Sequence, residues 1–109
     1  MKSIKAVIIE HENETVQLLN KFSDENSMII TICGVEKDFE SGLELIRQQR
    51  PELVFFNACE KNLKLFQLIN NIDFIAPKFI FMSNDTSSAY QAFKLNALGF
   101  LLKPLHFND

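Results

Sequence analysis

The sequence predicts an α/β fold in which helices wind around both faces of a parallel sheet. Short apolar runs alternate with stretches in which apolar residues recur at helical spacing, the pattern of repeated βαβ units. One run, Leu-Val-Phe-Phe at 53–56, has no polar alternation, which is typical of a strand buried on both faces. With 109 residues, the chain has room for one domain, which we place at 1–109.

The composition favours a dense core and argues against some classes of function. Hydrophobic residues make up 47% of the chain and 11 residues are phenylalanine, so a single large core is expected. The formal net charge of −3 argues against direct binding of nucleic acid. No apolar run approaches the ~20 residues of a membrane helix, and we find no signal peptide. We therefore expect a cytoplasmic protein whose cysteines, Cys33 and Cys59, stay reduced.

The first half of the chain predicts two strands, each followed by a helix. Residues 4–10 are largely apolar and β-branched and predict the first strand. A helix is expected over about 13–23, where apolar residues fall on one face. The second strand is expected at 28–33 and is closed by a glycine. Asp38 is a candidate N-cap for the second helix, and Pro51 ends it.

The middle of the chain predicts the central strand and a third helix. We expect the strand over 53–59, ending in the polar Asn57 and its neighbours. A fourth strand is expected at 79–82, after a proline-marked loop. Between them, four apolar residues predict one face of a helix: Leu65, Phe66, Ile69 and Ile72.

The last part of the chain predicts a fourth helix and a short final strand. Residues 84–86 offer several N-caps, and we expect Tyr90, Phe93 and Ala97 to form the inner face of the helix. A glycine then allows a tight turn into a strand at 100–102.

These elements predict a flavodoxin-like sheet with strand order 2-1-3-4-5, because right-handed crossovers leave few other topologies. In such sheets, the functional groups lie beyond the carboxyl ends of the strands. The polar residues at those ends are Glu10, His11, Asn57, Cys59, Ser83 and Lys103. We expect the first four to converge on one crevice, with Ser83 and Lys103 at the next two strand ends.

A fifth helix is not evident. Five strands of a doubly wound sheet usually carry five helices, but only about five residues follow Pro104. We therefore expect the fifth helix to be missing or truncated, with part of one sheet face bare unless another segment or chain covers it.

The final segment resembles a known family. Residues 92–104 (Ala-Phe-Lys-Leu-Asn-Ala-Leu-Gly-Phe-Leu-Leu-Lys-Pro) look like the AF-x-x-NA-x-x-YLLKP signature of response-regulator receiver domains from LytTR-type transcriptional regulators. Residues 50–55 (Arg-Pro-Glu-Leu-Val-Phe) are similar to the approach to the phosphorylation site in these domains. The resemblance covers nearly the whole chain and implies a receiver-type version of the flavodoxin-like fold.

The resemblance also implies a chemistry. In receivers an aspartate takes a phosphoryl group from a partner kinase, and two further acids hold Mg²⁺. By this match Lys103 and Ser83 take the positions that contact the phosphoryl group, and Phe100 takes the aromatic switch position. Pro104 matches a proline that is usually cis. The fourth helix, with Tyr90 and Phe93 (otherwise read as core positions), belongs to the face through which receivers contact partners.

Two departures remove this chemistry. The phosphoacceptor position holds Asn57, whose neutral amide oxygen is a poor nucleophile. The acidic pair reads Glu10-His11, which replaces a hard oxygen ligand with an imidazole. With Cys59 these residues form a degenerate magnesium pocket, in which we expect weak or absent Mg²⁺ binding. We therefore predict a pseudo-receiver that is not an enzyme and has no cofactor. It would act in signal transduction and transcriptional regulation by protein contacts.

Alternatives remain at this point. The first is a working phosphoreceiver with a non-standard acceptor, for which Glu60 is a weak candidate. The second is a small-ligand or metal-sensing module that uses the polar crevice of Glu10, His11, Asn57, Cys59 and Lys103. Within it, the residue types of Glu10, His11 and Cys59 also suit a transition metal. For partners, we expect a second copy or another protein on the face of the fourth helix, fifth strand and fifth helix. A sensor kinase is a further candidate, and DNA would be reached only through a domain outside these residues.

Overall fold

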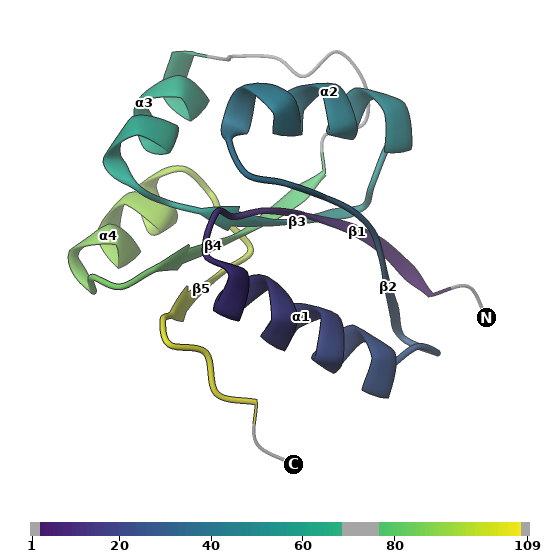
Figure 1. The fold of residues 1–109 in the computed structure, drawn as a ribbon. Helices are drawn as coiled ribbons and strands as arrows, with labels where there is room; N and C mark the ends of the chain where they lie inside the picture. Colours follow the sequence, from purple (N-terminus) through teal and green to yellow (C-terminus); the bar gives the residue numbers. More distant parts are fainter. Residues whose placement is uncertain (1–2, 69–76, 108–109) are drawn as a thin grey trace.

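The protein forms a five-stranded parallel sheet in the order β2-β1-β3-β4-β5, as the sequence predicts (Figure 1). This computed structural model describes residues 3–68 and 77–107. The strands are β1 (Ile4–Ile9), β2 (Ile30–Glu36), β3 (Leu53–Asn57), β4 (Lys78–Ser83) and β5 (Gly99–Leu102). The helices in the described residues are α1 (Asn13–Glu25), α2 (Phe39–Gln49), α3 (Glu60–Leu68) and α4 (Ser87–Lys94).

Helices cover both faces of the sheet, which therefore has a core on each side. Helices α2 and α3 lie over one face and α1 lies over the other (Figure 1). Along β1, Val7 and Ile9 belong to the core under α2, while Ala6 and Ile8 belong to the core under α1. Successive side chains of a strand point to opposite faces, so a strand covered on both sides must be apolar throughout. This explains the apolar run in β3, which is also buried over its whole length.

Phenylalanine rings fill the core between the sheet and α2–α3. The Phe56 side chain is fully buried, and its ring centroid lies 5.1 Å from Phe39, 5.5 Å from Phe66, 5.8 Å from Phe79 and 5.2 Å from Phe81. Tilted and edge-to-face arrangements at these spacings suit the quadrupoles of aromatic rings. The abundance of phenylalanine is therefore used mainly for packing.

Strands β2 and β3 have boundaries that differ from the expected ones by two or more residues. Strand β2 begins at Ile30, and the preceding Met28 and Ile29 are exposed in a turn. It continues past Gly34 to Glu36, so that this glycine lies within the strand. A Cβ at Gly34 would lie only 2.7 Å from Leu45 Cδ1 of α2. The glycine thus permits close packing of a helix instead of making a turn. Strand β3 ends at Asn57, two residues earlier than predicted.

The inner face of α4 is not the one predicted. Tyr90 is 65% exposed and Phe93 is 81% exposed, whereas Ala92 is buried. Small side chains allow the helix to lie close to the sheet, so alanine takes the inner position and the aromatic rings point outward. Ala97 does pack against the core, from the segment after the helix. The predicted helix positions Ile69 and Ile72 lie outside the described residues.

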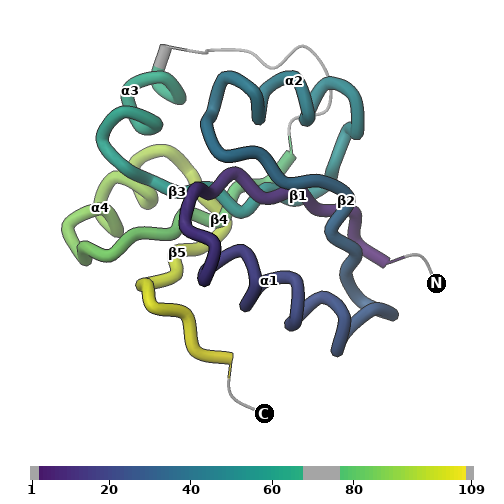
Figure 2. Tube along the Cα trace, in the orientation of Figure 1, coloured from purple at the N-terminus to yellow at the C-terminus, as the bar shows by residue number. Residues whose placement is uncertain are grey.

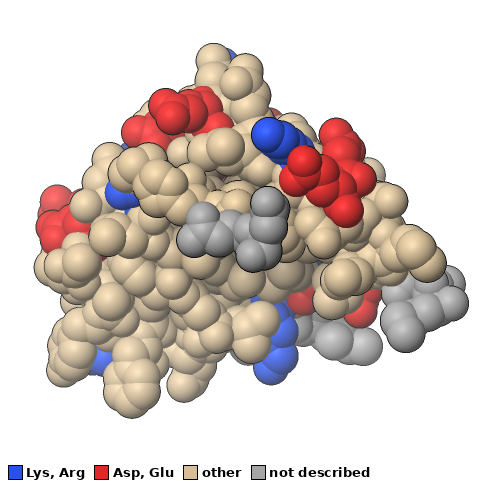
Figure 3. All heavy atoms as spheres, turned by 90° about the horizontal axis from the view of Figure 1, so that it is seen from below, with Lys and Arg blue, Asp and Glu red and all other residues tan. Residues whose placement is uncertain are grey.

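The chain after β5 covers part of the sheet face that we expected to be bare. In Figure 2 this segment runs on the same side of the sheet as α1. Leu105 is buried in the core beneath α1, and the Phe107 ring stacks on Phe22 with a centroid distance of 4.7 Å. Ile80 and Leu101 on the same face stay half-buried. From this side, charged side chains form separate groups divided by uncharged surface (Figure 3).

The helices are short, and one of them has the predicted N-cap. None of the helices in residues 3–68 and 77–107 is long and apolar enough to cross a membrane. Asp38 caps α2 as predicted, since its Oδ1 accepts a hydrogen bond from Ser41 N at 2.8 Å. Cys33 and Cys59 are both free thiols.

Replacing the central ring should destabilise the fold strongly. Phe56→Ala should lower the free energy of unfolding by about 3–5 kcal/mol, because it leaves a cavity among four other rings. Urea unfolding followed by circular dichroism measures the change. Phe93→Ala, at an exposed position, should stay within about 0.5 kcal/mol of wild type. Equal effects of the two substitutions would contradict this description of the core.

Candidate functional site

The polar residues at the carboxyl ends of the strands meet at one edge of the sheet. Glu10 directly follows β1, Asn57 is the last residue of β3, and Lys103 directly follows β5. All three side chains are buried. Parallel strands place their carboxyl ends together, so the strand order brings residues far apart in sequence into contact. Glu10, His11 and Asn57 thus converge as predicted, and Lys103, which was expected at a neighbouring strand end, joins them.

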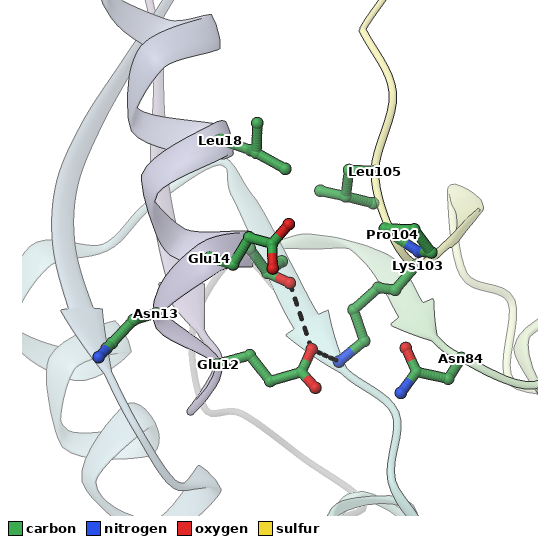
Figure 4. A pocket seen from close by; sticks show the side chains of 9 residues that line it. Glu12, Asn13, Glu14, Leu18, Asn84, Lys103, Pro104 and Leu105 are labelled. Carbon is green, nitrogen blue, oxygen red and sulfur yellow. Dashed lines mark hydrogen bonds and ion pairs between the residues drawn. The ribbon is translucent and has the colours of Figure 1, made fainter.

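The Lys103 ammonium is the centre of this site. Its Nζ lies 3.1 Å from Glu10 Oε1, 2.8 Å from Glu12 Oε1 and 3.4 Å from Asn57 Oδ1. The Lys103 side chain is only 4% exposed. Figure 4 shows it extending from the end of β5 toward the first turn of α1, where it meets Glu12. A buried ammonium requires partners of this kind, because it has lost its hydration.

The carboxylate of Glu10 is held through both of its oxygens. Oε1 accepts the bond from Lys103, while Oε2 accepts the backbone N–H groups of His11 at 3.1 Å and Glu12 at 3.2 Å. The side chain is fully buried. The loop after β1 therefore wraps around the carboxylate and fixes its orientation.

Both ends of the Asn57 amide are engaged. Oδ1 faces Lys103, and Nδ2 lies 3.0 Å from His11 Nδ1. Because an ammonium can only donate, the amide oxygen must face it, and the amide N–H group then donates to His11. His11 Nδ1 is thus the acceptor in this arrangement. The Asn57 carbonyl also accepts a bond from Asn62 Nδ2 at 2.8 Å.

Sequence reasoning missed Glu12 and Asn62. Glu12 lies two residues after Glu10 in an extended loop. Because alternate side chains of an extended chain point the same way, this spacing could have indicated that both carboxylates face the crevice. A hydrogen bond from Lys103 lowers the pKa of the Glu12 carboxyl below its usual range. Asn62 gave no signal of its own, because its role depends on the turn from β3 into α3.

Cys59 and Ser83 do not join the lysine cluster. Cys59 is exposed and lines a groove of about 620 Å³ between α3 and α4, together with Glu60, Ser83 and Asp85. Ser83 Oγ accepts a hydrogen bond from Asp85 N at 3.1 Å, and its carbonyl accepts one from Lys103 N. Among the described residues, no group of three or more His, Cys, Asp or Glu side chains could hold a metal ion. The hypothetical metal site of Glu10, His11 and Cys59 is therefore not assembled.

The residues present also do not fit the Mg²⁺ that the family resemblance implies. The oxygens of Glu10, Glu12 and Asn57 surround the Lys103 ammonium, which already carries the positive charge. His11 supplies a largely exposed imidazole where an acid would be needed. We derive no reaction step through a metal.

The residues at the other matched positions lie on the α4–β5 side. Phe100 in β5 is half-buried and packs against the core beneath α2, α3 and α4. Tyr90 and Phe93 lie exposed on α4. The peptide bond between Lys103 and Pro104 is cis, as the resemblance implies.

Removing the Glu12 carboxylate should change how stability depends on pH. The lowered pKa means that Glu12 stabilises the fold above its unfolded pKa of about 4.3 and loses this effect as the pH falls through its folded pKa. Glu12→Gln should therefore cost less than about 1 kcal/mol at pH 7, since the side chain is 39% exposed. The two proteins should converge in acid.

Urea unfolding at a series of pH values measures the difference. Glu14→Gln in the first turn of α1 provides the control, because it also removes an acidic side chain from the start of this helix. A Glu12→Gln effect that is independent of pH would contradict the ion pair with Lys103.

Comparisons with known proteins give one sequence relative and many structural ones. No family model matches the chain. An uncharacterised response regulatory protein of Vibrio cholerae is 28% identical over 103 residues, which cover 94% of this chain and 43% of the relative. The chain thus spans less than half the length of this curated relative.

Solved receiver structures share the fold. The receiver domain of the response regulator NarL from Mycobacterium tuberculosis superposes with a TM-score of 0.74 at 15% identity, covering 97% of this chain and 88% of that one. The response regulatory domain of mrkE from Klebsiella pneumoniae gives 0.72 at 22% identity, covering 94% and 85%. The chain therefore has the fold of response-regulator receiver domains.

Proposed function

We propose that this chain is an atypical response-regulator receiver domain that signals by protein contacts and not by phosphorylation of an aspartate. It would belong to a two-component type of regulator and catalyse no reaction of its own. The observation that carries this proposal is Asn57, which ends β3 at the position where the resemblance expects the phosphoacceptor.

The chemistry of the amide supports this proposal. Phosphoryl transfer to a receiver needs an anionic carboxylate oxygen as the nucleophile, and the amide oxygen of Asn57 is neutral. That oxygen already accepts a hydrogen bond from Lys103, and the amide nitrogen donates to His11. The Asn57 side chain is therefore a structural member of the cluster. A phosphorylated side chain at this position would break both contacts.

The face formed by α4 and β5 is the best candidate for partner binding. Tyr90 and Phe93 of α4 are exposed, and so are Leu98 before β5 and Leu102 within it. The Lys94 ammonium lies 5.3 Å from the centroid of the Tyr90 ring. Exposed aromatic and leucine side chains gathered on two adjacent elements favour a protein interface over a solvated face. We propose that a second copy of the chain or another protein docks here.

The resemblance of residues 92–104 to LytTR-type receivers extends the proposal to the whole protein. The chain spans 43% of its curated relative, which leaves room for a further domain in a protein of that length. We propose that a DNA-binding domain of the LytTR type accompanies this receiver, and that transcriptional regulation acts through it. The net charge of −3 supports assigning DNA binding to such a domain and not to these residues.

Incubation with acetyl phosphate and Mg²⁺, followed by intact-mass spectrometry, tests the loss of phosphorylation. We expect wild type to gain no phosphoryl mass, because the amide cannot form an acyl phosphate. An Asn57→Asp variant supplies the missing carboxylate, and phosphorylation of this variant would show that Asn57 alone disables the site.

Asn84→Asp is the matched control. Asn84 is an exposed asparagine close to Lys103 at the same edge of the sheet, so the control adds a carboxylate without changing the acceptor position (Figure 4). A phosphoryl group on wild type would overturn the proposal, and mapping the modified residue would then identify the true acceptor.

Removing the aromatic side chains of α4 should weaken self-association. If two copies dock through α4 and β5, the double variant Tyr90→Ser/Phe93→Ser should raise the dissociation constant at least about tenfold, since buried aromatic anchors dominate such interfaces. Sedimentation velocity over a range of concentrations measures this. Met28→Ser removes another exposed apolar side chain near the opposite edge of the sheet and should have no effect. A wild type that stays monomeric throughout would exclude the homodimer.

A further inference from the structure

We propose that Lys103 supplies the cation of this site, so that its ammonium takes the place of a divalent metal and keeps the crevice charge-balanced without one. This inference concerns the same site as the proposed function and rests on the receiver likeness only for the expectation of a metal. It explains why an acidic crevice can be retained when its acceptor is an amide.

The geometry around Nζ is that of a complete cation site. Glu10, Glu12 and Asn57 each present one oxygen to it, at 3.1, 2.8 and 3.4 Å. The ammonium donates hydrogen bonds to Glu10 and Asn57 and forms an ion pair with Glu12, so three oxygens surround its charge. Carboxylate and amide oxygens are also the ligands that hard divalent cations prefer. The oxygens that would suit a metal therefore already contact the Lys103 ammonium.

The location of the charge opposes the binding of a second cation to the same oxygens. The Lys103 side chain is 4% exposed and the Glu10 side chain is fully buried, so neither charge can turn away into solvent. A divalent ion bound to the same oxygens would lie within a few ångströms of the ammonium, in surroundings that screen charge poorly. Metal binding would thus require the lysine to leave its partners.

The covalent attachment of this cation distinguishes it from a metal. Lys103 directly follows β5, and its backbone N–H donates to Ser83 O at the end of β4 at 2.8 Å. The ammonium therefore connects the ends of β1 and β3 to β5. A metal could leave, whereas this cation cannot, so the arrangement of the carboxyl edge beside the α4–β5 face does not depend on metal supply.

Titration of the protein with MgCl₂, MnCl₂ and CaCl₂ tests the proposal. Isothermal calorimetry and thermal unfolding should detect no saturable binding by wild type up to about 10 mM, which exceeds the dissociation constants of weak protein calcium sites. Lys103→Met frees the three oxygens and should gain saturable binding, with a dissociation constant of about 1 mM or lower, at least about tenfold below the highest concentration tested. Its thermal midpoint should rise with metal concentration.

Two further variants control this result. Lys21→Met removes an exposed lysine from α1 and should behave like wild type. Lys103→Met/Glu10→Gln removes the buried carboxylate as well and should lose the gained binding. If Lys103→Met does not fold by itself, the divalent ions should restore its folding, because they would replace the missing charge beside Glu10.

Three results would overturn the proposal. These are saturable cation binding by wild type, a folded Lys103→Met protein that responds to cations no more than Lys21→Met, and an unfolded Lys103→Met protein that cations do not rescue. None of them depends on phosphoryl transfer, so failure here is distinguishable from failure of the proposed function, which the mass measurement on wild type and Asn57→Asp decides.

Discussion

The buried ion pair between Lys103 and Glu10 is the constraint on which the rest of the site depends. The two residues are 93 positions apart, and they meet because β1 and β5 end at the same edge of the sheet. Removing one partner of such a pair leaves an uncompensated charge in the interior, typically at a cost of about 3–5 kcal/mol. The strand order, the loop that wraps Glu10 and the placement of Asn57 must therefore all be compatible with this contact.

The same contact explains why the amide at position 57 is tolerated. A carboxylate there would add a further negative charge beside Glu10 and Glu12, whereas the amide offers an oxygen to Lys103 and an N–H group to His11. Asn57 thus completes a network in which no buried side-chain nitrogen or oxygen of the described residues lacks a hydrogen-bonding partner. A neutral residue at this position is consistent with a fixed arrangement of the crevice.

The sequence carried enough information for the sheet and for most of the site. Strand order followed from the alternation of apolar runs and helical stretches, and that order brought Glu10 and Asn57 together as predicted, while Lys103 reaches them from the end of β5. The errors arose where tertiary packing decides. Gly34 resembles a turn residue, but it lies within β2, where the Leu45 side chain packs closely against it. Tyr90 and Phe93 resemble core residues, but the close approach of α4 favours Ala92 inside. The hydrophobic pattern identifies apolar positions without saying which are covered.

These errors on α4 bear on how such a domain can signal. A partner that docks on Tyr90 and Phe93 can shift a conformational equilibrium only by the difference between its affinities for the two states. Phe100 packs into the core beneath this face, and Lys103, three residues later, joins the crevice. Any rearrangement of β5 would therefore have to work against the three contacts of the ammonium. A coupling between the crevice and the proposed docking face would be reciprocal, so the contacts of Lys103 would act on both. Under the proposed function, a partner would therefore recognise one constant surface on α4 and β5.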